Sequence, residues 1–502
     1  MSMNFSEISV FIIYLCCMLA IGVFFFFKDR KGGEKTYFLG DRKMGPWVAA
    51  LSAGASDMSA WLLMGLPTSI YAIGIGEVWI AIGLGLGYAI SWIIEAPRLR
   101  RFSIVSGDAI TIPQYLSNRF KATSHATQTI CAIVFLIAYT IYAATSIKAC
   151  GTLFNKVIGM DPMKAMYLSA FIIISYTFLG GFSAVCWTDF FQGMLILGAM
   201  LLAPIFALFM LQGHAEISPE LAPDYYNAFA DWRQVVNGLA WGLGYFGMPH
   251  IIIRFMSIKS QKALKQSSII GISWTAIVLV FAAIIGVVGR IKLGYNPEIV
   301  EKEIVFVEMV RKIFPGIISG VLLSAVLAAA MSTADSQLLA ASSAFTSDVY
   351  KPLIRKGKTS DEELLWNGRL IVLIVSLAAL LIATNPNSGT IMGLVSNAWG
   401  IFGAAFGPAI LLSLFWRNFN SKGAIAGIVV GTAVDILWLC YCGTPDAGLF
   451  KLVPCLNCIA GVYEIVPGFL CGLAAAVGVT FMTGTPNKEV QQLFDEAVKY
   501  QD

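Results

Sequence analysis

Long apolar runs alternate with short polar segments along the whole chain. The hydrocarbon core of a bilayer is about 30 Å thick, so an α-helix needs roughly 20 apolar residues to cross it. Runs of that kind predict about thirteen transmembrane helices. They cover residues 8–27, 45–74, 77–96, 127–150, 163–182, 190–212, 233–256, 268–289, 315–346, 368–384, 389–415, 423–442 and 463–482. The pattern therefore predicts an all-α polytopic membrane protein.

The run 45–74 is too long, and too polar in its middle, to be one ordinary helix. A straight helix of that length would measure about 45 Å, half as long again as the hydrocarbon core. Asp57 lies near its middle among small residues, and a carboxylate at that depth marks a functional site. Gly54 allows the backbone to leave helical geometry. We expect a break that frees carbonyl and N–H groups for an ion and a solute, with a close helix-packing face as the alternative.

A second run, 233–256, is interrupted by Gly242, Gly244, Gly247 and Pro249. These residues weaken helical hydrogen bonding, although a simple proline kink is the alternative. Two interrupted spans, five spans apart, favour inverted five-helix repeats with a discontinuous first helix in each, an architecture of transporters. The expected units are 1–44 (a peripheral helix and loop), 45–212 and 213–415 (the repeats) and 416–502 (two peripheral helices and a tail).

The segment 325–348 gathers hydroxyl groups on a small-residue helix. Ala329, Ser332 and Ser336 share one face at spacings of three and four, beside Thr333. Hydroxyl and freed carbonyl oxygens suit a hard cation such as sodium. Hydrogen bonds between helices explain the cluster equally well.

Other polar or aromatic side chains lie inside predicted spans: Tyr142, Trp241, Tyr245, Asp189 and Asp435. The aromatic residues fit either a binding site or an ordinary core. Asp189 is expected near the cytoplasmic boundary, where a carboxylate reaches water, with a helix-terminus role and a site role left open. Asp435 is expected to find a local partner.

Composition and charge support a membrane location. The chain is 57% hydrophobic and 13% charged, against about 25% charged in soluble domains, and its mean hydropathy is +0.75. Alternate loops hold 24 of the 34 Lys and Arg residues: 28–44, 97–125, 254–265, 351–369, 416–422 and the C-terminal tail. Basic loops stay cytoplasmic, so we expect the N-terminus outside and the C-terminus inside.

No phosphate-binding loop, HExxH motif or nucleophile elbow occurs in the sequence, so we expect neither ATP-driven transport nor an enzyme. The loop between the last two predicted spans carries Cys440, Cys442, Cys455 and Cys458. Because that loop is expected outside, free thiols or a disulfide are favoured over zinc.

Four segments, in order, resemble the sodium/solute symporter family: SAGASDMSAWLLMGLP, FLGGFSAVCWTD, WGLGYFGMPHIIIRFMS and AAAMSTADSQLL. The similarity runs from about residue 35 to 480 and is strongest to members that carry proline. It implies a LeuT-type core with peripheral helices. It also implies sodium-coupled import of L-proline across the cytoplasmic membrane by alternating access.

The resemblance also implies site residues. Sodium would be held by the carbonyl oxygens of Ala55, Met58 and Ala329 and the hydroxyls of Ser332 and Thr333. Residues for sodium affinity or a second sodium site would be Asp57, Asp189 and Ser336. The solute pocket would be shaped by Ala60, Trp61, Tyr142, Trp241, Tyr245 and Pro249. Ala60 stands where proline symporters usually have glycine, which leaves the exact solute range open.

Fold alone does not fix the substrate. A sodium symporter for sialic acid, a vitamin or a sugar is therefore the alternative within transport. A channel or a sensor without coupled transport is the alternative outside it; a channel predicts rings of charge along a pore, and a sensor an appended signalling domain.

Overall fold

The computed structural model describes residues 5–29, 33–122, 124–179, 181–211, 224–442 and 460–501. Within these ranges every regular element is a helix, and the extended backbone forms one isolated bridge, between Met44 and Ile258. The prediction of an all-α protein is confirmed.

Ten helical runs in the described part of the chain are long and apolar enough to cross a membrane. Eight of these runs are single helices: α1 (Phe5–Asp29), α8 (Ala126–Ile158), α10 (Phe182–Met210), α13 (Gln261–Leu293), α17 (Asp361–Ala383), α18 (Ile391–Phe415), α19 (Ser421–Tyr441) and α21 (Ile465–Thr483). The remaining two contain π-helical turns: α5 (Val78–Ile90) continues through η4 (Ser91–Glu95) into α6 (Ala96–Val105), and α16 (Gly316–Phe345) continues into η6 (Thr346–Ile354).

The two runs expected to be interrupted are both discontinuous. The first consists of α3 (Pro46–Asp57), a π-helical turn η2 (Trp61–Gly65) and α4 (Leu66–Ile73). The second consists of α11 (Trp232–Ala240), a 3-10 segment η5 (Trp241–Phe246) and α12 (Pro249–Ser257). Helix α9 (Pro162–Leu179) occupies the remaining predicted range.

The break after α3 is not at Gly54. The helix continues through Gly54 to Asp57, and the chain leaves helical geometry at Met58, where φ is −78° and ψ is 71°. A Cβ at Gly54 would lie 2.7 Å from the Trp274 ring of α13. Gly54 is therefore needed for close packing of two helices and not for a change of backbone direction.

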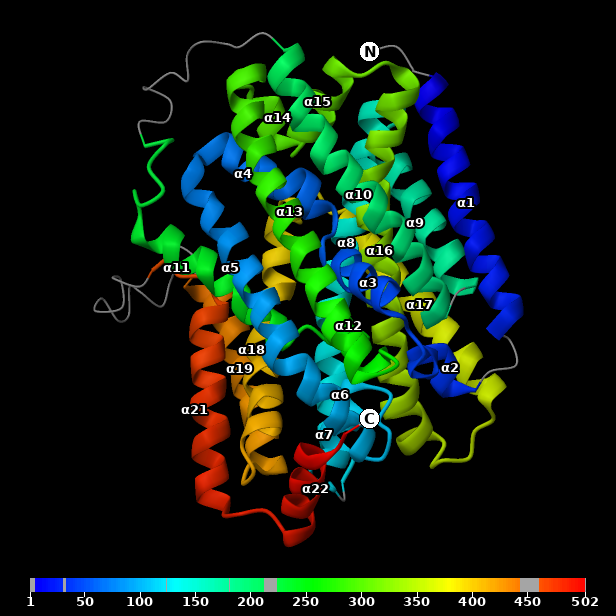
Figure 1. Ribbon diagram of the computed structural model, residues 1–502, viewed down its shortest axis with the longest axis vertical. Helices are drawn as coiled ribbons and strands as arrows, with labels where there is room; N and C mark the ends of the chain where they lie inside the picture. The colour runs from blue at the N-terminus through cyan, green and yellow to red at the C-terminus, as the bar shows by residue number, and fades with distance from the viewer. Residues whose placement is uncertain are drawn as a thin grey trace.

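Figure 1 shows long, nearly parallel helices, with α1 at one edge and α19 and α21 at another. The short helices α2 (Glu34–Leu39), α7 (Ile112–Arg119) and α22 (Lys488–Lys499) lie at one end, and α14 (Pro297–Glu301) and α15 (Val305–Ile313) at the other. The most apolar windows of α16 and α18 are 83% buried, against 22% for α1. The core is therefore built around α16 and α18, while α1 leaves most of its surface for lipid.

Candidate ion and solute site

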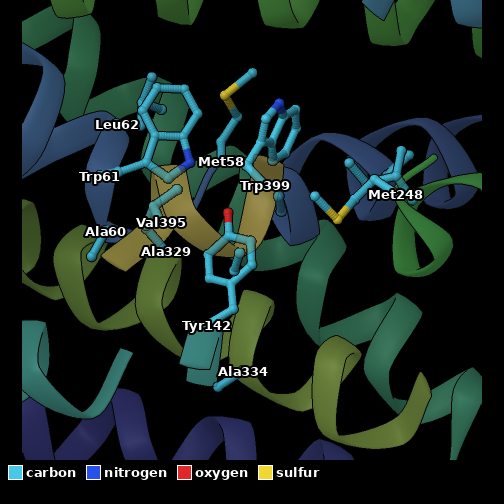
Figure 2. Packing of buried hydrophobic residues seen from close by; sticks show 14 of the residues in the cluster. Met58, Ala60, Trp61, Leu62, Tyr142, Met248, Ala329, Ala334, Val395 and Trp399 are labelled. Carbon is cyan, nitrogen blue, oxygen red and sulfur yellow. The ribbon is translucent and has the colours of Figure 1, made fainter. Parts of the chain in front are cut away.

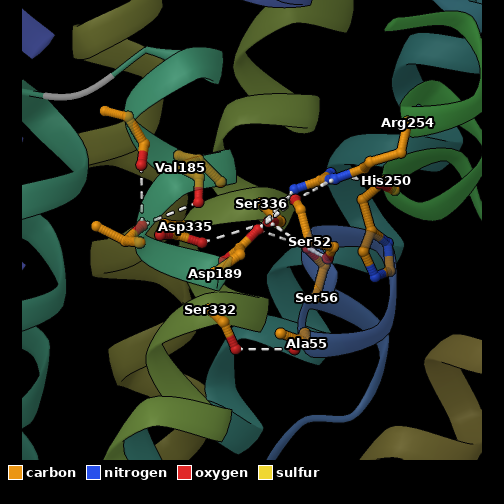
Figure 3. Close-up of polar contacts among 12 residues, drawn as sticks. Ser52, Ala55, Ser56, Val185, Asp189, His250, Arg254, Ser332, Asp335 and Ser336 are labelled. Atoms are coloured by element: carbon orange, nitrogen blue, oxygen red, sulfur yellow. Dashed lines mark hydrogen bonds and ion pairs between the residues drawn. The ribbon is translucent and has the colours of Figure 1, made fainter. Parts of the chain in front are cut away.

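The end of α3 presents a freed carbonyl to a hydroxyl of α16. In a continuous helix, Ala55 O would accept from Ser59 N, but that amide donates to Asp57 O at 2.8 Å. Ser332 Oγ instead lies 2.8 Å from Ala55 O (Figure 3). The same hydroxyl lies 3.2 Å from Ala329 O. The break in α3 therefore brings three oxygen atoms from two helices together, the kind of set that a hard cation needs.

Two more residues expected at this position lie on the same elements. Thr333 follows Ser332 on α16, and its buried Oγ1 has no hydrogen-bond partner in the structure. Met58 is buried at the end of α3, where its non-helical ψ turns its carbonyl away from the helix ladder. A buried oxygen without a partner is costly, so Thr333 Oγ1 is an available ligand.

Asp57 joins the two discontinuous segments. Tyr245 of η5 donates a hydrogen bond from its hydroxyl to Asp57 Oδ2 at 2.6 Å, and Asp57 Oδ1 is buried without a partner. Trp61 Nε1 donates to the Asp57 carbonyl at 3.2 Å. Asp57 therefore lies between a residue expected to bind solute and the oxygens expected to bind sodium.

Aromatic rings from three elements pack beside this cluster. The Trp61 and Trp241 ring centroids are 6.4 Å apart, and those of Trp241 and Trp399 are 6.0 Å apart. Tyr245 meets Trp399 edge-on at 5.1 Å. Figure 2 shows Met58 between Trp61 and Trp399, with the Tyr142 hydroxyl pointing toward the same space. That hydroxyl is buried without a partner.

The sequence did not point to Trp399, although its indole completes the aromatic group. Trp399 Nε1 donates to Trp241 O at 2.8 Å. A Cβ at Gly244 would lie 2.0 Å from Trp399 Nε1, so the glycine is what allows this approach. The only available signal was a single tryptophan in the glycine-rich stretch NAWGIFGAAFG.

The two other residues expected in the solute pocket lie next to the breaks. Pro249 begins α12, and Ala60 is buried immediately before η2.

A family model described as the sodium:solute symporter family matches residues 37–431. The chain belongs to this family. The prediction of a multi-pass, sodium-coupled transport protein is therefore confirmed.

Relatives of this symporter have 40% identical residues over 496 positions. They include proteins named sodium/proline symporter from Staphylococcus aureus strains USA300 / TCH1516 and NCTC 8325 / PS 47. In each comparison the match covers 97% of this chain and 95% of the relative.

Solved structures resemble the symporter in fold. A sodium-coupled sialic acid symporter in a substrate-bound outward-open state superposes with a TM-score of 0.75 at 21% identity, covering 96% of this chain and 99% of that one. Mhp1, a nucleobase-cation symporter in a closed conformation, gives 0.56 at 14% identity, with coverage of 92% and 98%. MhsT in complex with L-phenylalanine gives 0.54 at 14% identity, with coverage of 88% and 99%. At these identities the likeness concerns the fold alone.

Asp189 does not lie near water as expected. Helix α10 begins at Phe182, so Asp189 is about two turns inside it, and it is fully buried. Its Oδ2 lies 3.2 Å from Arg254 Nη2 of α12 in a buried ion pair. The prediction placed the start of this helix eight residues too late, because the polar stretch SAVCWTD interrupts the apolar run.

Asp435 also differs from expectation, because both of its buried carboxylate oxygens lack a hydrogen-bond partner in the structure. It packs against Gly400 and faces Glu464, not a donor. In the cysteine-rich loop, Cys440 is exposed and Cys442 buried, whereas Cys455 and Cys458 lie outside the described residues.

Proposed function

We propose that this symporter imports L-proline together with sodium across the cytoplasmic membrane by alternating access. The observation that carries the proposal is the freed Ala55 carbonyl of α3 bound by the Ser332 hydroxyl of α16. The 40% identity to sodium/proline symporters over nearly the whole chain supports proline as the solute.

The proposed sodium ligands are three carbonyls and two hydroxyls: Ala55 O, Met58 O, Ala329 O, Ser332 Oγ and Thr333 Oγ1. Five neutral oxygens suit a hard monovalent cation. Asp57 adds a buried carboxylate nearby with one unpartnered oxygen. A cation that enters this region offsets the charge of that carboxylate, so Asp57 is proposed to raise sodium affinity without being a ligand.

The proposed solute pocket offers a different surface to each part of proline. The Trp61 amide donates to Ser59 Oγ over the long distance of 3.4 Å, and we propose that the carboxylate of proline replaces this acceptor at the helix start. The Trp241 face suits the apolar ring and the secondary ammonium. The Tyr142 hydroxyl, which has no partner, is an additional polar contact.

The bond between Tyr245 and Asp57 supplies a physical route for coupling. Tyr245 packs against Trp399 in the aromatic group. Its hydroxyl donates to the carboxylate of Asp57, which we propose raises the affinity for sodium. A solute that shifts the Tyr245 ring changes the environment of Asp57. Solute and sodium would then each favour binding of the other, because a coupling free energy is reciprocal.

We further propose thirteen spans, formed by the ten long helices, α9 and the two discontinuous segments. The units remain 45–212 and 213–415 as inverted repeats, with 1–44 and 416–502 peripheral. The N-terminus lies outside and the C-terminus inside. In support, the start of α1 and helix α22 lie at opposite ends of the molecule, and α2, α7 and α22 share one end (Figure 1).

The solute assignment is tested by competition. Labelled proline uptake into vesicles would be measured with a sodium gradient and an excess of unlabelled solutes. We expect proline to compete most strongly, and sialic acid, vitamins and sugars to compete weakly. Stronger competition by any of these other solutes would overturn the assignment of proline.

A further inference from the structure

Arg290, in the last turn of α13, is a buried cation that forms no ion pair with the described residues. The residue is 3% exposed, and its Nη1 is buried without a hydrogen-bond partner in the structure. Arginine stays charged throughout the physiological pH range. Because buried charges are as a rule paired, the free donor of this guanidinium indicates a site for an anion.

Three tyrosine rings enclose the guanidinium and form what we call the tyrosine cage. Its Cζ lies 4.4 Å from the ring centroid of Tyr295, which follows α13, and 5.6 Å from that of Tyr225, which precedes α11. The third ring, that of Tyr71 in α4, is 5.7 Å away and is stacked on Tyr295. Ring faces attract a cation, but the N–H groups in the plane of a guanidinium need acceptors as well.

The carboxylates of the segments around the cage have other partners or are exposed. Glu77, in the turn after α4, accepts from a glutamine amide at 3.3 Å. Glu298 of α14 and Glu308 of α15 lie 3.0 Å and 2.6 Å from lysine Nζ atoms. Glu303 accepts from two backbone amides of α18. The two others are exposed: Asp224 and Glu301.

The charge at this end of α13 therefore remains positive. Lys292 lies in the same last turn and donates to a backbone carbonyl at 2.9 Å, so it adds a second cation. The C-terminus of a helix carries only about half a negative charge. That half charge does not balance Arg290 and Lys292 together.

We propose that the tyrosine cage binds a small monovalent anion, such as chloride, between Arg290 Nη1 and the Tyr225 hydroxyl. Tyr225 is 1% exposed, and its hydroxyl oxygen is buried without a partner. The Tyr71 hydroxyl, by contrast, donates to the Gly294 carbonyl and accepts from Asn296 N at 2.8 Å. One charged and one neutral donor suit a single monovalent anion.

The exposure of the three rings limits what can enter. Tyr295 is 44% exposed, whereas Arg290 and Tyr225 are buried, so an anion reaches the guanidinium past the Tyr295 ring. This end of α13 leads into α14, at the end of the molecule that we propose to lie outside (Figure 1). External chloride is small enough for such a site, and a bulky anion such as gluconate is not.

A bound anion would attach the outer half of the first discontinuous segment to α13. Tyr225 lies directly on the chain after α4, because its carbonyl accepts from Ile75 N at 2.8 Å. A Cβ at Gly74 would lie 2.5 Å from the same carbonyl. An anion that joins Tyr225 to Arg290 therefore stabilises the packing of α4 against α13, without being a ligand of the proposed sodium or solute sites.

Thermal unfolding of the purified full-length protein tests the proposal. Chloride would be varied at constant sodium and ionic strength, with gluconate as the replacement. A ligand of the folded state raises Tm with its concentration, so we expect the Tm of the parent to rise with chloride. Arg290→Met has similar reach without charge or donor and should lose this rise. Tyr225→Phe keeps the ring, and its half-saturating chloride concentration should increase by about tenfold.

Arg417→Met is the control, because Arg417 pairs with Asp495 on the surface at 2.8 Å through two nitrogen atoms. Its Tm should respond to chloride as that of the parent does. A parent Tm that does not change with chloride would overturn the proposal. An equal rise in Arg290→Met would also overturn it, since the effect would then be a general effect of salt.

If Arg290→Met cannot be recovered as a folded protein, Tyr225→Phe decides the outcome. A half-saturating concentration equal to that of the parent would then overturn the proposal, and an increase would support it. The measurement involves neither proline nor a sodium gradient. Its failure therefore leaves the proposed transport function standing, and a failure of proline uptake leaves the anion site standing.

Discussion

Thr333 contributes a hydroxyl that the resting structure leaves without a hydrogen bond. Thr333→Ala should therefore weaken sodium activation without changing which solutes compete. A bond to a charged group contributes about 1.5–3 kcal/mol, so we expect the sodium concentration for half-maximal uptake to rise by about tenfold or more. Sodium activation curves of the parent, Thr333→Ala and Thr333→Ser would be compared. Thr333→Ser retains the oxygen and should stay near the parent, and coincident curves for parent and alanine variant would remove Thr333 from the site.

Trp241 packs against Trp61, Trp399 and Tyr463, and contributes no oxygen to the proposed sodium shell. Trp241→Ala should raise the apparent KM for proline by about tenfold or more, because a desolvated cation–π contact is worth about 2 kcal/mol and apolar contact is lost with it. Sodium-dependent Tm should change little. Trp232→Ala is the control, since Trp232 is 49% exposed. An unchanged KM in Trp241→Ala would exclude Trp241 from the solute pocket.

At the residue scale, local pattern predicted the hydroxyl cluster of α16 but not the partners of each polar group. Ser332 and Thr333 could be singled out because polar groups are rare in an apolar helix. Arg254 and Trp399 could not, because their partners Asp189 and Trp241 lie 65 and 158 residues away in sequence. Nothing in the local sequence reports such distant contacts.

At the scale of elements, close packing of η5 against α18 depends on Gly244. Its Cβ position lies 2.0 Å from Trp399 Nε1, so Gly244→Ala must displace an indole that also packs on Tyr245. Overpacking of a core costs about 1–3 kcal/mol, and we expect a lower Tm together with impaired proline uptake.

Gly198→Ala is the matched control, because a Cβ there meets no atom within 4 Å. Alanine also favours helix formation at that position in α10. We expect the Tm of Gly198→Ala to equal or exceed that of the parent. If both variants behaved alike, the steric role of Gly244 would be wrong.

The discontinuous segments were recognisable from sequence, but their boundaries were less so. Gly54 was expected to open α3, yet the helix continues through it because Trp274 needs the space. The chain leaves the helix at Met58, where no glycine or proline occurs. Around η5, by contrast, the clustered glycines and Pro249 do coincide with the break. Glycine thus indicated either close packing or a break, and only the tertiary contacts distinguish the two.

At the scale of the whole molecule, the apolar runs were enough to predict a multi-pass helical protein, because the bilayer fixes the length of each span. The resemblance in sequence located the family through four short segments. Internal polar pairing such as Asp189 with Arg254 had to come from the structure, since the position of a carboxylate along a span does not reveal its partner.

In the proposed mechanism, a sodium gradient drives proline import. Proteoliposomes containing the full-length protein would receive labelled proline under an inward sodium gradient at equal pH, or under an inward proton gradient without sodium. Asp57, Asp189, Asp335 and His250 are fully buried titratable side chains, of the kind that a proton relay through a membrane protein uses. We predict accumulation above equilibrium with the sodium gradient and none with the proton gradient, because hydroxyls and carbonyls bind sodium without exchanging protons near neutral pH. Equal accumulation with the proton gradient in sodium-free vesicles would contradict the account.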